Sequence, residues 1–160
     1  MDQSERLDHA SIRGAIEAYL SLIDGQAKVD LTDYSLLAVT LDRLVLEYHI
    51  TESLEPSDSD IETPEISGAE IYSRAGKSFP ELGLYPWADV NDEPGSKPGV
   101  ADAIDDLADI ARDLLEVLWY FDQNRIQDGI WQFRWGYQNH WGAHLHKLRV
   151  LLHSPKICAW

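Results

Sequence analysis

The residues best suited to chemistry lie between positions 131 and 146, which read WQFRWGYQNHWGAHLH. His140 and His144 are four residues apart, so a helix places both imidazoles on one face, one turn apart. Two histidines at this spacing bind zinc or another divalent metal when a third ligand comes from elsewhere. The chain lacks a Glu after His140, which the HExxH motif of zinc proteases has, so hydrogen-bonded histidines without a metal are the simpler interpretation. The candidate third ligands are Asp109, Asp113 and Glu70.

Arg134 lies on the apolar face of the same predicted helix, beside core candidates such as Ile130 and Phe133. A guanidinium in such a place needs a partner, because an unpaired buried charge is very costly. We expect Asp109 or Asp113 to supply that partner, in a buried ion pair that fixes the register of two helices. The alternative makes Arg134 the anchor for a small anionic ligand, either a carboxylate or a phosphate.

The tryptophans of this helix fall on two stripes. Trp141 shares the apolar face, whereas Trp131 and Trp135 lie about 100° away from it around the helix. A helix with so wide an aromatic arc either packs on several neighbours or presents its second stripe to a partner. Gly142, in the helix interior, indicates that another backbone approaches closely there.

Apolar residues recur at helical spacing in four long segments and one short one, and no segment has the alternation of a strand. We therefore predict an all-α helical bundle, with residues 1–160 forming a single domain. Ser11 is the expected N-cap of the first helix, and Gly25 is expected to end it. The predicted long helices cover residues 11–25, 30–50, 100–120 and 127–153, and the short one covers residues 68–77.

Acidic side chains are concentrated in two places. Residues 51–67 contain two prolines and no Lys or Arg, which predicts a solvated, mobile loop. In the predicted helix over residues 100–120, six acids fall on the side opposite the apolar face, and we expect that side to face water. These acids are Asp102, Asp105, Asp106, Asp109, Asp113 and Glu116.

The formal charge of −15 over 160 residues repels phosphate backbones and anionic membranes, so neither nucleic acid nor membrane is expected as a partner. The single cysteine, Cys158, forms no internal disulfide, and the first residues lack the apolar run of a signal peptide. No apolar stretch approaches the roughly 20 residues that span a bilayer. We therefore expect a cytoplasmic protein.

Two segments resemble a known family. Residues 105–118, DDLADIARDLLEVL, and residues 128–153, DGIWQFRWGYQNHWGAHLHKLRVLLH, are similar to the signature of an uncharacterised bacterial family, domain of unknown function 5063. The family's aromatic-helix pattern falls on Gly129, Ile130, Trp131, Arg134, Tyr137, Trp141, Gly142 and His144. Ala111 stands where the family pattern has Tyr. The resemblance covers mainly the C-terminal third and implies a small helical protein, without implying an activity, a ligand or a catalytic residue.

Two functions are compatible with these observations. The first is a non-enzymatic binding or interaction module that uses the aromatic helix, with Arg134 and Trp141 near its centre. Its partner would be an unknown protein, a second copy in a homodimer, or a small anionic ligand. The second is a metal-binding protein or metal-dependent enzyme that uses His140 and His144 with carboxylates of a neighbouring helix. Because no nucleophile motif, phosphate loop or dinucleotide fingerprint is present, we predict no catalytic residue and no cofactor.

Overall fold

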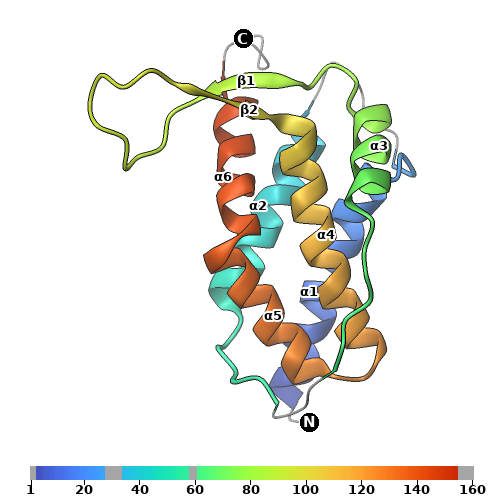
Figure 1. The fold of residues 1–160 in the computed structure, drawn as a ribbon. Helices are drawn as coiled ribbons and strands as arrows, with labels where there is room; N and C mark the ends of the chain where they lie inside the picture. Colours follow the sequence, from blue (N-terminus) through green and yellow to red (C-terminus); the bar gives the residue numbers. More distant parts are fainter. Residues whose placement is uncertain (1–2, 28–33, 58–60, 155–160) are drawn as a thin grey trace.

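The computed structural model describes residues 3–27, 34–57 and 61–154, and Figure 1 shows how its elements are arranged. In chain order these are α1 (Gln3–Ile23), α2 (Ser35–Ile50), α3 (Gly68–Ser78), β1 (Leu84–Trp87), β2 (Gly99–Asp102), α4 (Ala103–Asp122), α5 (Ile126–Asn139) and α6 (Trp141–Leu152). The predicted helical character is confirmed. The predicted count is wrong, because the described residues form six helices and a two-stranded sheet. None of the described helices is long and apolar enough to cross a membrane.

The first helix begins earlier than predicted. Ser11 lies within α1 instead of capping it, and its hydroxyl donates a hydrogen bond to Glu47 Oε1 of α2 at 2.7 Å. Gly25 follows the helix end as predicted, with a φ of +66° that glycine adopts without steric cost. Ser11 therefore joins α1 to α2, which pack side by side.

The helix α4 is the central element, because it packs against α1, α3, α5 and α6 (Figure 1). The Asp102 side chain caps its start by accepting a hydrogen bond from the Ile104 N–H at 2.9 Å. The expectation that its acidic side faces water is wrong, because α5 and α6 cover much of that side. Asp106 is only 3% exposed, whereas Asp105 is exposed as expected.

The last predicted helix is broken in two at His140, whose φ of −147° and ψ of −83° are not helical. Two glycines make the break sterically feasible. A Cβ on Gly142 would lie 2.2 Å from the Tyr137 carbonyl oxygen, and a Cβ on Gly136 would lie 2.8 Å from Trp141 Cδ1. The close backbone approach predicted at Gly142 is confirmed, and the approaching backbone is the end of α5.

The strands β1 and β2 form an antiparallel pair in which Leu84 lies opposite Asp102. The prediction of no strands is wrong here, because four-residue strands are too short for their alternation to be recognised, and Pro86 lies in one of them. Tyr85 points into the core and Leu84 outward. The loop between the strands extends away from the helices (Figure 1), while β1 brings Tyr85 to α4.

The described parts of the acidic loop form no helix or strand between α2 and α3, and they are bonded to the start of α5. The backbone N–H of Ser57 donates to Asp128 Oδ1 at 2.7 Å, and Arg125 Nε donates to Asp128 Oδ2 at 2.7 Å. Burial alone would raise the pKa of Asp128, but the hydrogen bonds from Ser57 and Arg125 lower it. Residues 58–60, Cys158 and the predicted start of the second helix at 30–33 lie outside the described residues.

Arg134 does not pair with Asp109 or Asp113. Its Nη1 donates to the carbonyl oxygens of Tyr48 and Thr51, each at 2.5 Å, and its guanidinium lies 4.6 Å from the centre of the Tyr48 ring. The last carbonyls of a helix have no partner within the helix and carry its partial negative charge. Arg134 therefore ties α5 to the C-terminal end of α2.

Replacing Gly142 with Ala is expected to lower the free energy of unfolding by about 1–3 kcal/mol, because the new Cβ collides with the Tyr137 carbonyl. The control is Gly76→Ala in α3, where the added Cβ meets only Ile104 Cγ2 at 3.7 Å. This control should be neutral or stabilising, since Ala is the better helix former. Urea denaturation followed by circular dichroism measures both. Equal stability of the two variants would contradict this account of the break.

Replacing Arg134 with Met is expected to cost about 2 kcal/mol of stability, because two charge-assisted hydrogen bonds to the end of α2 are lost. The control is Arg74→Met, which removes a half-exposed ion pair to Asp24 and should cost less than about 1 kcal/mol. Thermal and urea unfolding of both variants measure the difference. An Arg134 variant as stable as the wild type would show that this contact does not hold α5 to α2.

Candidate metal centre

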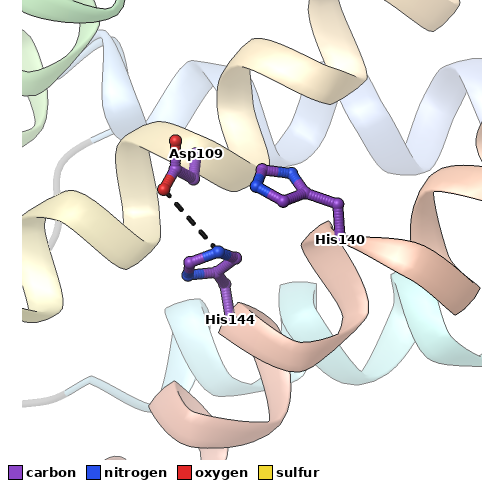
Figure 2. A group of neighbouring side chains, drawn as sticks. All are labelled: Asp109, His140 and His144. Atoms are coloured by element: carbon purple, nitrogen blue, oxygen red, sulfur yellow. Dashed lines mark ion pairs between the residues drawn. The ribbon is translucent and has the colours of Figure 1, made fainter. Parts of the chain in front are cut away.

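Three side chains from separate parts of the chain converge between α4 and α6, as Figure 2 shows. Asp109 comes from the middle of α4, His140 from the junction between α5 and α6, and His144 from the second turn of α6. One donor atom from each lies within 4.8 Å of the other two. His144 Nε2 and Asp109 Oδ2 are 3.6 Å apart. This is a set of two imidazole nitrogens and one carboxylate oxygen.

The two histidines stay together although the helix breaks at the first of them. The backbone N–H of His140 donates to the Gly136 carbonyl at 2.8 Å, and its carbonyl accepts from the Ala143 N–H at 3.1 Å. His140 is therefore bonded to both helices, and the two imidazole centres are 4.9 Å apart. The predicted placement of His140 and His144 beside each other is confirmed, even though the single helix behind the prediction was wrong.

A second carboxylate orients each imidazole. His140 Nδ1 lies 2.7 Å from Asp113 Oδ2, and His144 Nδ1 lies 2.6 Å from Asp106 Oδ1. In a neutral imidazole whose Nδ1–H donates to a carboxylate, the lone pair is on Nε2. Histidine ligands of protein-bound metals are commonly oriented in this way by a carboxylate on the other nitrogen.

Asp106 is itself held from two further sides. The Tyr85 hydroxyl of β1 donates to Asp106 Oδ2 at 2.5 Å, and Lys147 Nζ of α6 lies 3.9 Å from Oδ1. Burial, the hydrogen bond to Asp106 and the charge of Asp106 raise the pKa of Tyr85 far above its usual value. The phenol therefore stays protonated and remains a donor. β1, α4 and α6 are thus connected through one buried carboxylate.

One carboxylate oxygen of Asp109 pairs with Arg112, and the other points toward His144. Arg112 Nη2 lies 3.0 Å from Asp109 Oδ1, while Asp109 Oδ2 faces His144. Arg112 Nε also lies 3.9 Å from Asp113 Oδ1, so the same guanidinium offsets part of the charge of both acids. Asp109 Oδ2 is therefore the carboxylate atom that is available to a bound cation.

The local charge is negative. The pKa of Asp105, one turn before Asp109, is raised by burial and then by the negative charges of Asp109, Asp102 and Asp106. A region that already disfavours one more negative charge attracts cations and repels anions. The small anionic ligand considered for Arg134 is therefore not favoured at this cluster.

The other predicted site residues lie elsewhere. Trp141 is fully buried, and its indole N–H donates to the Phe133 carbonyl at 3.2 Å. Trp131 and Trp135 stack on each other with centres 5.8 Å apart, and Trp135 is 45% exposed. Glu70 is exposed on α3 and does not join the cluster.

The sequence does not point to two residues that support the cluster, Tyr85 and Asp106. Tyr85 gave no signal, because nothing in LGLYPW indicates that β1 returns to α4. Asp106 belongs to the side of α4 that helical periodicity predicts to face water. Its signal was the three-residue step to Asp109, which places both carboxylates on nearly the same side of α4.

One solved structure is similar over most of the chain. The crystal structure of protein BF1032 from Bacteroides fragilis superposes with a TM-score of 0.71 and 15% sequence identity, covering 90% of this chain and 89% of that one. At this identity the likeness shows the fold alone. No curated protein matches the chain.

The family resemblance extends well beyond the C-terminal third. The sequence profile described as Domain of unknown function (DUF5063) matches residues 10–156, which include α2 to α6 and most of α1. The expectation that the family match covers mainly the C-terminal third is wrong, because the profile also matches the first helices. Their agreement with the family pattern is loose. The chain belongs to the DUF5063 family.

Proposed function

We propose that this protein binds a divalent transition-metal ion through His140, His144 and Asp109. The observation that carries the proposal is the convergence of their donor atoms within 4.8 Å, with both imidazoles oriented by carboxylates. Imidazole suits zinc, iron, copper and nickel, and two histidines with one carboxylate leave coordination positions open for another ligand. Such a site would supply a Lewis acid to a small molecule.

Small movements are sufficient to form the site. Ligand atoms around one zinc ion are separated by roughly 3–3.5 Å, so the donors must approach one another by an ångström or two from their present spacing. His140 is more exposed than His144, and its side chain is the one with room to move. The Nδ1 bonds to Asp113 and Asp106 need not break, because the metal takes the other nitrogen of each ring.

The interaction role of the aromatic helix has weaker support. The two residues expected near its centre are occupied inside the protein, since Trp141 is fully buried and Arg134 binds the end of α2. Trp131 and Trp135 remain as a partly exposed pair. The geometry therefore favours metal binding over recognition through this helix.

Protein purified without a histidine tag and freed of metal is expected to bind one Zn²⁺ per chain, measured by titration calorimetry and elemental analysis. Replacing either histidine with Ala, or Asp109 with Asn, removes one of three ligands and should weaken binding by at least about 100-fold. The control is His146→Ala, which removes an exposed histidine on the same helix, bonded to Tyr137. Failure of the wild type to take up Zn²⁺ or Co²⁺ would disprove the proposal, as would equal weakening by His146→Ala.

Tyr85→Phe is expected to weaken Zn²⁺ binding by about 10-fold, because Asp106 then holds His144 less firmly. The control is Tyr72→Phe, since the Tyr72 hydroxyl also donates to an Asp near the start of α4, Asp102 at 2.8 Å, outside the cluster. The visible spectrum of bound Co²⁺ reports whether the ligand geometry changes. Unchanged affinity and spectrum in Tyr85→Phe would show that Tyr85 contributes only to folding.

A further inference from the structure

The outward face of α2 carries an apolar stripe. Leu36, Val39, Leu46 and Ile50 are between 47% and 63% exposed and lie on one side of the helix. Together with Arg43 they are spaced by three, four, three and four residues, which is the spacing of a helix–helix packing seam. A solvent-facing helix side in a small protein is ordinarily polar, so a stripe running about 21 Å, from Leu36 to Ile50, indicates a contact surface.

The stripe reads nearly the same from both ends. Val39 and Leu46 are equidistant from the midpoint between residues 42 and 43, and Leu36 and Ile50 are equidistant from residue 43. A two-fold interface brings the same surface of each subunit together and so must be complementary to itself. When two copies of α2 pack antiparallel about this midpoint, Val39 faces the partner's Leu46, and Asp42 faces the partner's Arg43.

The charges fit this arrangement. Asp42 already binds Arg149 of α6 in a bidentate pair at 2.6 and 3.0 Å, but a carboxylate has about four acceptor sites and can take a further donor. Arg43 lies beside Gly14 and 4.0 Å from Glu47, with 45% of its side chain exposed, so its guanidinium has donors left. Two symmetric Asp42–Arg43 pairs would then lie at the centre of the apolar seam.

The geometry points to a homodimer in which α2 packs antiparallel against α2 of a second copy. The overall charge of −15 makes contact through most other surfaces repulsive, whereas in this seam the one acid of each chain, Asp42, faces the Arg43 of the other chain. A strong interface buries roughly 1,200–2,000 Å², more than one helix stripe supplies. The exposed Val150 of α6, which packs beside α2, extends it. We expect a dissociation constant in the micromolar range.

Sedimentation velocity of the full chain from 1 to 500 μM should show a reversible monomer–dimer equilibrium. Val39→Glu with Leu46→Glu should raise the dissociation constant at least about 100-fold, because four charges then meet in the seam. Circular dichroism should be unchanged, since both positions are exposed. Trp135→Glu, on the aromatic helix, is the control and should leave the dimer intact.

A charge swap tests the register. Arg43→Asp places an acid opposite Asp42 in each symmetric pair and should weaken the dimer about 10-fold. Adding Asp42→Arg together with Arg149→Asp, which reverses the charges of the pair between α2 and α6 without breaking it, should restore most of the dimer. A wild-type chain that stays monomeric at 500 μM would overturn the inference. A dimer that survives Val39→Glu with Leu46→Glu, or that Trp135→Glu abolishes, would overturn it as well. Failure of the swap to restore dimerisation would exclude the antiparallel register.

Discussion

The burial of one carboxylate, that of Asp106, is the constraint on which much of the structure depends. A carboxylate at 3% exposure has lost most of its water, so hydrogen bonds and nearby positive charge must replace it. Tyr85 donates from β1, His144 from α6, and Lys147 adds a charge. Meeting these needs fixes the hairpin and α6 against α4. The arrangement that satisfies Asp106 also leaves His144 Nε2 directed at Asp109.

The break at His140 also helps to place the two histidines against α4. A continuous helix would extend α6 along the axis of α5. Because the helix is broken, α5 and α6 can each pack against α4 at an angle of their own. The cost of a non-helical residue is offset locally, because His140 keeps backbone hydrogen bonds to both helices. Its side chain then bonds to Asp113, one turn along α4 from Asp109. The two histidines thus each bond to one acid of α4, and the donor atoms of both lie within 4.8 Å of a third acid, Asp109.

Helical periodicity alone predicted that His140 and His144 lie together, because that pairing needs only local spacing. It left Asp109 as one of three candidate third ligands. Helical periodicity did not predict the contacts and breaks that occur at the ends of helices. The partners of Arg134 are main-chain carbonyls at the end of α2, which no side-chain pattern reveals. The break at His140 was not predictable from the sequence, because the sequence does not show that Gly136 lies against Trp141 and Gly142 against the Tyr137 carbonyl. The acidic side of α4 was expected to face water because the sequence does not show that α5 and α6 cover it.

Charge counting supports the proposed binding of a divalent cation by His140, His144 and Asp109. Asp106, Asp109 and Asp113 contribute three negative charges, and Arg112 and Lys147 contribute two positive ones. With neutral histidines the sum is therefore −1, and one divalent ion brings it to +1. A monovalent anion would instead bring it to −2 in a partly buried place, where charge repulsion is poorly screened. Protons compete with a cation for imidazole nitrogens, so the proposed metal binding is expected to weaken as the solution becomes more acidic.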